Sequence, residues 1–216
     1  FFGGWLPDRN TDSPDHWTLV LGDTAWQPSK PLPIARGHLS GAVLAEKLYA
    51  IGGAVGHDPV PIDRADVHRF DPATGRWEEA PALPFAVSHS EPATSVYDGR
   101  LLVVGGRSRN LGHENLDDVL LFDPGLERWI HIARTPKPLL GGLTATVGDT
   151  LFVGLGATRG NDPDNPLIWR TSLRNTWRLG DSLPLPLGEV SGGIIDGKLY
   201  LVGEDSPHTL RFDLST

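Results

Sequence analysis

The chain has 216 residues, including 26 glycines and 19 prolines, and 39% of its residues are hydrophobic, so it can bury a core and is not a disordered chain. Its 27 acidic residues outnumber its 19 basic ones, and the net charge of −8 argues against binding to nucleic acid, which needs a basic surface. The sequence has no cysteine, which excludes disulfides and thiolate metal sites, and no apolar stretch approaches the roughly 18 residues of a membrane span.

The first 35 residues hold pieces of a pattern that later segments complete. They begin with Phe1-Phe2-Gly3-Gly4, which resembles the end of a β-strand and carries neither an initiator methionine nor a signal peptide. Trp26 and Pro31-Leu32-Pro33 follow. We therefore interpret residues 1–35 as a partial repeat and expect the chain to be an interior fragment of a longer protein.

Residues 36–84 and 85–136 form the two clearest repeats. In each, an apolar run ends in a glycine pair, a later run ends in Phe-Asp-Pro, and a tryptophan follows after a short turn. The glycine pairs are Gly52-Gly53 and Gly105-Gly106, the Phe-Asp-Pro triplets begin at Phe70 and Phe122, and the tryptophans are Trp77 and Trp129. Turn pairs such as Asp98-Gly99 separate the apolar runs and are typical of β-hairpins.

Residues 137–184 and 185–216 keep the pattern less completely. The first of these units has Gly154-Leu155-Gly156 in place of the glycine pair and lacks Phe-Asp-Pro, but it keeps Trp177. The second keeps Gly203 alone and reaches Phe212-Asp213 without a following tryptophan. Between Trp26 and Trp177 the tryptophans are 51, 52 and 48 residues apart, so the period is about fifty residues.

A period of this length, built from short β-branched and aromatic runs, predicts a unit of four antiparallel strands, A to D. Strand A precedes the Asp-Gly turn, strand B ends at the glycine pair, strand C ends at Phe-Asp-Pro and strand D begins at the tryptophan. Because one small sheet cannot bury both faces, such units stack radially with large apolar residues between them. Glycine at the end of strand B permits positive φ and close approach of a neighbouring backbone. The tryptophan is expected to pack between sheets.

These motifs resemble the Kelch repeat over nearly the whole chain. The resemblance implies an all-β fold, a Kelch-type β-propeller of four-stranded antiparallel blades, in a single domain covering residues 1–216. About four to five blades are represented, fewer than the family usually needs to close its ring, so an incomplete ring is expected. The expected blades cover residues 1–35 (partial), 36–84, 85–136, 137–184 and 185–216 (partial).

The alternating strand directions place the B–C loops and the D–A connections on one face of such a propeller. The B–C loops are long and cover roughly residues 54–65, 107–117 and 157–168. Long loops on a rigid scaffold usually carry function, so we expect the site on this face.

Polar residues gather at the start of strand A in successive repeats. Alignment on the glycine pairs matches Arg36 with His89 and His38 with Glu91, and the series continues with Gly141 and Glu189. The residues expected to bind ligand at this rim are Arg36, His38, His57, Asp58, His89, Glu91 and Arg107.

Histidine and carboxylate side chains together could bind a divalent metal, perform acid–base chemistry, hold a polyol or cap strands. No pair has the spacing of a dedicated zinc site and no complete catalytic constellation is present, so no catalytic residue, metal or cofactor is predicted. The favoured function is a binding module that presents its B–C and D–A loops to a protein or a glycan. The stretches Arg36–Gly53, Gly56–Asp58 and Ser88–Pro92 are similar to Kelch regions of secreted bacterial proteins. This similarity favours a secreted or periplasmic location and leaves a cytoplasmic one open.

Two enzymes with this fold supply the alternatives. Galactose oxidase uses copper and a tyrosine crosslinked to cysteine, and the absence of cysteine excludes that cofactor here. Sialic-acid mutarotases need only an acid–base pair beside a sugar pocket. Such a pair could come from Glu91 or Glu189 together with Arg36 or Arg107, so a carbohydrate-active epimerase is the alternative function.

Overall fold

The structure is a computed structural model that describes residues 1–8, 10–57, 60–112, 115–160, 165–173, 177–184, 187, 190–203 and 206–213. The described residues form β-strands, turns and one short 3-10 helix, η1 (Arg109–Leu111). The expected all-β fold is therefore confirmed. These residues contain no helix with the length and hydrophobicity needed to cross a lipid bilayer.

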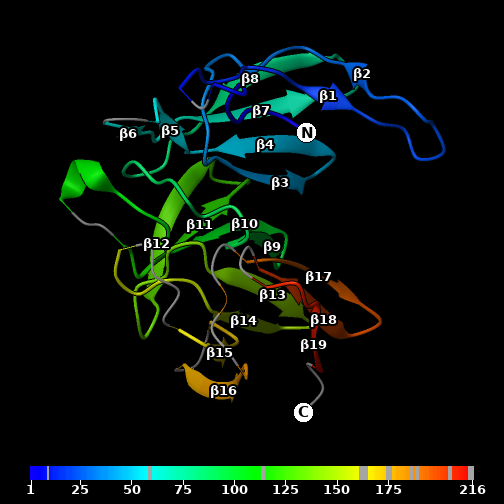
Figure 1. Cartoon of the computed structure of the whole chain (residues 1–216). Coiled ribbons are helices and arrows are strands. Elements are labelled where there is room, and N and C mark those ends of the chain that lie inside the picture. Colours follow the sequence, from blue (N-terminus) through cyan, green and yellow to red (C-terminus); the bar gives the residue numbers. More distant parts are fainter. Residues whose placement is uncertain are drawn as a thin grey trace.

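The strands assemble into a series of small antiparallel sheets, which we number as blades in chain order (Figure 1). Blade 1 holds β1 (Trp17–Thr18) and β2 (Gln27–Pro28), with bridges from Phe2 to His16 and from Trp5 to Asp12. Blade 2 holds β3 (Ser40–Leu44), β4 (Lys47–Ile51), β7 (Val67–Asp71) and β8 (Arg76–Ala80). Blade 3 holds β9 (Thr94–Tyr97), β10 (Arg100–Val104), β11 (Asp118–Asp123) and β12 (Arg128–Arg134).

The later blades continue the series. Blade 4 holds β13 (Leu143–Val147), β14 (Thr150–Gly154), β15 (Leu167–Thr171) and β16 (Arg178–Ser182). Blade 5 holds β17 (Ser191–Ile195), β18 (Lys198–Val202) and β19 (Leu210–Asp213). The pair β5 (Ala54–Val55) and β6 (Ile62–Asp63) stands in the loop between β4 and β7.

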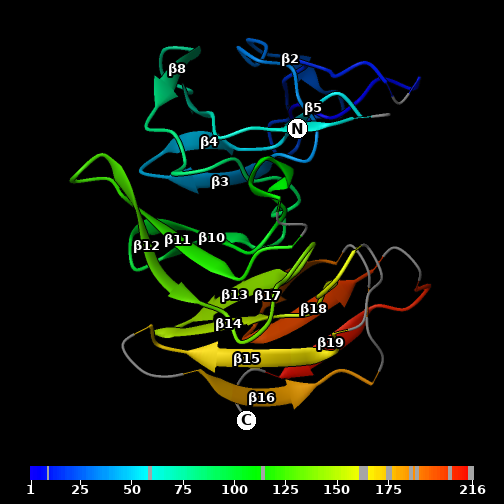
Figure 2. The ribbon, with the colours of Figure 1, turned by 90° about the vertical axis from the view of Figure 1, so that its left-hand side faces the viewer.

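The first strands of blades 2 to 5 lie next to one another through the middle of the molecule, β3 beside β9, β9 beside β13 and β13 beside β17 (Figure 1). Seen from the side, the sheets of blades 1, 2 and 3 follow one another in chain order, and blades 4 and 5 overlap beyond them (Figure 2). Within blade 3 the strands occupy the predicted places, because β9 ends before Asp98-Gly99 and β10 ends before Gly105-Gly106. The four-strand repeat is thus confirmed.

Apolar side chains fill the spaces between neighbouring blades, since each sheet can bury its faces only against the next one. Between blades 2 and 3 the cluster includes Tyr49, Ile51, Leu101, Leu120 and Phe122. Separate clusters fill the spaces between blades 3 and 4 and between blades 4 and 5. Burial of these side chains is the main term that holds the blades together.

The glycine pairs lie where one blade's backbone touches the next. The φ angles of Gly105 and Gly106 are +65° and +90°, and the N–H of Gly106 donates to the Leu139 carbonyl at 2.7 Å. A Cβ on Gly105 would stand 2.3 Å from the same carbonyl oxygen. Both predicted reasons for glycine, positive φ and close backbone approach, are therefore confirmed.

The repeated tryptophans connect successive blades through a hydrogen bond. The indole N–H groups of Trp77, Trp129 and Trp177 donate to the carbonyls of Lys30, Pro81 and Arg134 at 2.8, 2.8 and 2.7 Å. In each case the acceptor lies just beyond strand D, or at its end, in the preceding blade. The predicted packing role is confirmed for these three tryptophans, which lie against the apolar clusters, but not for Trp26, which is 52% exposed. The hydrogen bond explains why an aromatic ring with an N–H group occupies the position.

Replacing Trp129 with phenylalanine is expected to lower the free energy of unfolding by about 1 kcal/mol, because the aromatic packing remains while one hydrogen bond is lost. Trp26→Phe is the matched control, since Trp26 occupies the same motif position but is 52% exposed. Urea denaturation followed by fluorescence compares the two. Equal losses would contradict the role of the hydrogen bond.

Candidate functional site

One face of the molecule carries the long connections. It is formed by the described parts of the B–C loops (52–57, 60–66, 105–112, 115–117, 155–160 and 165–166) and by the segments that lead into β3, β9 and β13, and we call it the loop face. In Figure 1 β5, β6 and η1 mark this side at the left, while the β3–β4 and β17–β18 turns lie at the right. Bridges between Gly37 and Ala54, Ser88 and Arg107, and Leu140 and Ala157 fix where each inner strand meets its B–C loop.

These bridges correct the alignment of the rim residues. They make His38 equivalent to His89 and Gly141, so the predicted match of Arg36 with His89 is wrong. His38, His89 and Gly141 share a left-handed backbone, with φ of 46°, 56° and 58°. The N–H of His89 donates to the His38 carbonyl at 3.2 Å, and the N–H of Gly141 donates to the His89 carbonyl at 3.1 Å. The three positions therefore form a continuous hydrogen-bonded line across three blades.

Four side chains from the predicted set meet at this line. The imidazole rings of His38 and His89 stack with centroids 3.6 Å apart, and His57 lies 6.5 Å from His38. His38 Nδ1 lies 3.2 Å from Glu91 Oε1. The indole of Trp5 contacts His38 and His57 edge to face, each at a centroid distance of 4.5 Å. We call Trp5, His38, His57, His89 and Glu91 the histidine cluster; all five side chains are half-buried at the rim.

An ion pair between buried Asp63 and half-buried Arg109 is connected to the histidine cluster through Ser88. The Asp63 side chain in β6 is fully buried and accepts hydrogen bonds from the backbone N–H and guanidinium of Arg109 at 2.6 and 2.8 Å. Ser88 Oγ also donates to Asp63, at 2.7 Å, and lies 2.8 Å from His89 Nδ1. The network thus joins the first two B–C loops to the residue that precedes His89.

This network sets the tautomer of His89. A serine hydroxyl has one hydrogen, and Ser88 gives it to the Asp63 carboxylate. His89 Nδ1 must therefore carry a hydrogen and donate to Ser88 Oγ, which leaves the lone pair on Nε2. Burial, together with the neighbouring His38 ring and the positive charges of Arg107 and Arg109, lowers the pKa of His89 to about 2. His89 is accordingly a neutral hydrogen-bond acceptor at physiological pH.

Arg36 is not part of the rim. Its side chain is fully buried, and its guanidinium donates to the carbonyls of Gly52, Ile34 and Ala50 at 2.6, 3.1 and 3.2 Å. Its position corresponds to the buried Val87 and Leu139 of the next blades, since Gly4, Gly53 and Gly106 donate to the carbonyls of Arg36, Val87 and Leu139. Burial lowers the pKa of Arg36 to about 10, which still leaves it charged at neutral pH. We assign Arg36 a structural role and remove it from the expected ligand-binding set.

The two remaining predicted residues have different outcomes. Arg107 is 8% exposed, contributes to the positive potential around His89 and donates to the Gly160 carbonyl at 3.2 Å. Asp58 lies outside the described residues. Within the described residues, no group of three or more histidine or acidic side chains is arranged to hold a metal ion.

Three participants were not predicted from the sequence. Trp5 follows Gly3-Gly4, whose φ angles of +68° and +95° match those of the later glycine pairs, so alignment of this first pair would have placed Trp5 at the rim. The indole lies directly over Gly37, where a Cβ would stand 2.6 Å from it. Asp63 and Ser88 had no such signal, because they act through contacts between separate loops.

Comparison with known proteins agrees with this geometry. The sequence matches the Kelch motif over residues 35–84 and 89–136. It is 27% identical over 206 residues to mouse Kelch-like protein 35, and 25% identical over 215 residues to Kelch-like protein terF of Aspergillus terreus. Those alignments cover 94% and 92% of this chain but 33% and 44% of the relatives, so the chain spans less than half of their length.

The solved structure of YjhT superposes with a TM-score of 0.77 at 16% sequence identity, covering 91% of this chain and 67% of that one. Stacked antiparallel blades whose first strands line the middle define a β-propeller. The glycine pairs and the tryptophans between blades are the landmarks of a Kelch-type propeller. The chain is a β-propeller that contains Kelch repeats, matched over residues 35–84 and 89–136, and its sequence is similar to Kelch-like proteins.

Proposed function

We propose that the protein is a non-catalytic binding module that holds a protein or carbohydrate ligand on the loop face, with the histidine cluster at its centre. The observation that carries the proposal is the meeting of Trp5, His38, His57, His89 and Glu91 from three blades at one half-buried rim. Kelch-repeat propellers act as protein-binding modules, and this supports a protein ligand.

The electrostatics of the cluster support binding over acid–base chemistry. A general base works best when its pKa lies near the operating pH. His89, with a pKa of about 2, is too weak a base for proton transfer near neutrality. It remains suited to accept a hydrogen bond through Nε2, as a hydroxyl or amide of a ligand requires.

The backbone at the rim also supports a functional role. A left-handed φ costs a non-glycine residue roughly 1 kcal/mol, and such residues gather at functional sites. Gly141 shows that glycine fits this position, yet His38 and His89 occupy it in the two preceding blades with φ of 46° and 56°. Histidine is thus kept there at an energetic cost that structure alone does not require.

The alternative, a carbohydrate-active epimerase, receives less support. It paired a glutamate with Arg36 or Arg107, but Glu91 contacts His38 and Arg36 is buried among backbone carbonyls. Glu189 lies outside the described residues. Epimerase activity would therefore need an acid–base pair other than Glu91 with Arg36.

Replacing His89 with asparagine tests the proposal, because asparagine tolerates the left-handed φ while removing the ring. Ligands would be selected with the labelled protein on a glycan array and from a phage-displayed peptide library. We expect the selected ligand to lose at least about tenfold in affinity for His89→Asn, as is typical of a residue central to an interface.

His131→Asn is the control, since His131 lies on the outer strand β12 and pairs with Asp118. Its affinity should equal that of the unmodified protein. Equal binding by His89→Asn would remove His89 from the site. The proposal would be overturned if neither the glycan array nor the peptide library yields a ligand. It would also be overturned if the selected ligand binds the His89→Asn and Glu91→Gln variants as tightly as the unmodified protein.

A further inference from the structure

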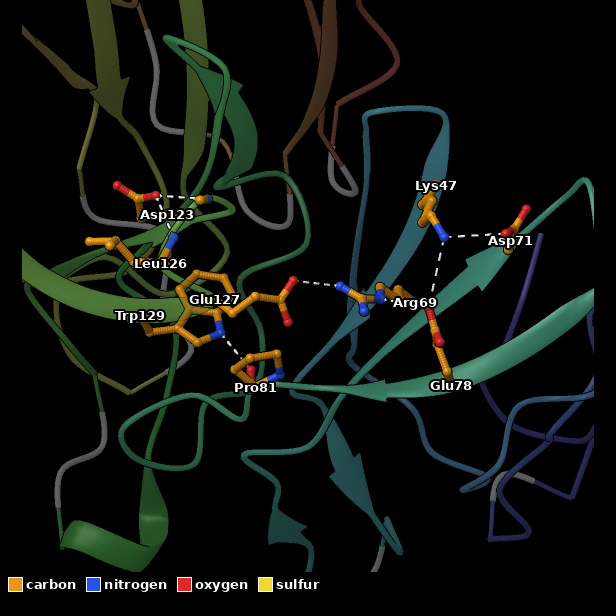
Figure 3. A network of polar contacts seen from close by, with 10 residues as sticks. Lys47, Arg69, Asp71, Glu78, Pro81, Asp123, Leu126, Glu127 and Trp129 are labelled. Atoms are coloured by element: carbon orange, nitrogen blue, oxygen red, sulfur yellow. Dashed lines mark hydrogen bonds and ion pairs between the residues drawn. The ribbon is translucent and has the colours of Figure 1, made fainter.

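The face opposite the loop face contains the A–B and C–D turns, and there ion pairs bridge the gap between blades 2 and 3. Arg69 in β7 donates to Glu78 in β8 and to Glu127 in the β11–β12 turn, both at 2.7 Å. Lys47 adds contacts to Asp71 and Glu78 at 3.2 and 3.7 Å (Figure 3). The side chain of Arg69 thus reaches from one blade to the next.

Between blades 3 and 4 the positions equivalent to Arg69 and Glu78 are apolar, Leu121 and Ile130. Register makes Leu121 equivalent to Arg69, because Leu121 pairs with Leu102 and Ile130 as Arg69 pairs with Tyr49 and Glu78. A cavity of about 380 Å³ lies here, within the range of small-molecule sites. Its apolar lining includes Leu121, Ile132, Leu173 and the ring of Tyr97.

The hydroxyl of Tyr97 fixes this cavity between the blades. It lies 2.8 Å from the carbonyls of Asp149 and Ser172, both of blade 4. The cavity therefore has walls from two blades that a direct hydrogen bond joins. An apolar ligand would gain its free energy here by leaving water for the Leu121, Ile132 and Leu173 side chains.

The charges at the cavity mouth are unbalanced. Arg100 lines the cavity, but its guanidinium forms ion pairs with Asp98 at 3.0 Å and Asp123 at 3.6 Å. Asp149 also lines it and forms no ion pair among the residues that the structure describes. The protein as a whole carries a charge of −8. The rim therefore favours a positive group over a negative one.

We propose that this cavity binds a small organic cation with an apolar body, the apolar part lying against Leu121, Ile132 and Leu173 and the ammonium group facing Asp149. The site is independent of the loop face and of the ligand proposed for it.

Phenethylamine is a suitable probe, measured by titration calorimetry and by amide chemical shifts of the whole chain. We expect it to bind, and we expect 2-phenylethanol, which lacks the charge, and putrescine, which lacks the ring, each to bind at least about fivefold more weakly. The amide signals of Gly148, Asp149 and Ser172 should move, while those of His38 and His89 stay in place. Equal affinity for phenethylamine and 2-phenylethanol would contradict the preference for a cation. No binding of phenethylamine at millimolar concentration would contradict the proposal that this cavity is a binding site.

Two substitutions locate the binding. Leu121→Arg places in this gap the residue found between blades 2 and 3, and it should abolish binding by filling the cavity with a positive side chain. Asp149→Asn should weaken binding about fivefold. Asp196→Asn is the matched control, because Asp196 occupies the A–B turn of blade 5 and does not line the cavity. Binding that survives Leu121→Arg in a folded protein, or that falls equally in Asp196→Asn, would overturn the assignment. If the Leu121→Arg variant does not fold, the affinity of the Asp149→Asn variant and the amide signals that move on binding test the location of the site.

Discussion

Replacing Gly105 with alanine is expected to lower the free energy of unfolding by about 4 kcal/mol or to prevent folding. Two effects add. At φ of +65° an alanine costs roughly 1–2 kcal/mol relative to glycine. The new Cβ would also stand 2.3 Å from the Leu139 carbonyl oxygen and 3.2 Å from that of Leu116, both backbone atoms of the interblade contact. The blades would have to separate to relieve the overlap, which opens the apolar cluster between them.

Gly99→Ala separates these two effects. Gly99 has nearly the same φ, +69°, but no heavy atom lies within 4 Å of its Cβ position. Its substitution is expected to cost only about 1 kcal/mol. Urea denaturation monitored by tryptophan fluorescence measures both variants. Similar losses would show that backbone conformation, and not contact between blades, requires glycine at the end of strand B.

The Gly105 contact also explains why the fold was predictable from the sequence. Each landmark of the repeat meets a local structural requirement that recurs from blade to blade, most completely in blades 2 and 3. Gly106 must approach the next blade, Trp129 must reach the Pro81 carbonyl, and Asp123 accepts from Gly125 and Leu126 in its turn. Because the same structural requirement returns about every fifty residues, the same residue type returns at the same position, and this repetition can be recognised in the sequence alone.

The candidate site was predicted in part, because it depends on how the blades differ. His38 lies 14 positions before Gly52, whereas His89 lies 16 before Gly105. The two additional residues precede β9, so alignment on the glycine pairs displaced the rim by two positions. His38, His89 and Glu91 are still predicted at the rim because they lie near strand starts, and His57 because it lies in a long B–C loop.

Burial could not be read from the sequence at Arg36. An arginine beside a predicted rim resembles a ligand-binding residue, and only the register shows that it occupies an interior position held by Val87 and Leu139 elsewhere. Its charge is tolerated there because Ile34, Ala50 and Gly52 offer carbonyl acceptors. Those acceptors are backbone carbonyl groups, so the residue types at these positions do not reveal them.

Replacing Asp63 with alanine is expected to lower the free energy of unfolding by about 3 kcal/mol, since removal of the buried carboxylate leaves Arg109 and Ser88 without their acceptor. Arg109 would lose two hydrogen bonds and Ser88 one. Glu78→Ala is the control. It breaks a contact of 2.7 Å to Arg69, close to the 2.8 Å of the Asp63 pair, but Glu78 is 50% exposed, so solvent screens the pair and a much smaller loss is expected.

The same variant tests the link between this network and the loop face. With Asp63 present, Ser88 can only accept from His89, and ¹⁵N shifts of the imidazole should indicate a hydrogen on Nδ1. Without Asp63 the serine hydroxyl is released to donate to Nδ1, so a mixture of the two tautomers is expected. A fixed Nδ1–H form in both proteins would contradict this link even if stability falls as expected. His89 can offer its Nε2 lone pair only in the Nδ1–H form. A mixture of tautomers in the Asp63 variant would therefore mean that the buried Asp63 carboxylate of blade 2 determines whether His89 of blade 3 accepts a hydrogen bond from a ligand.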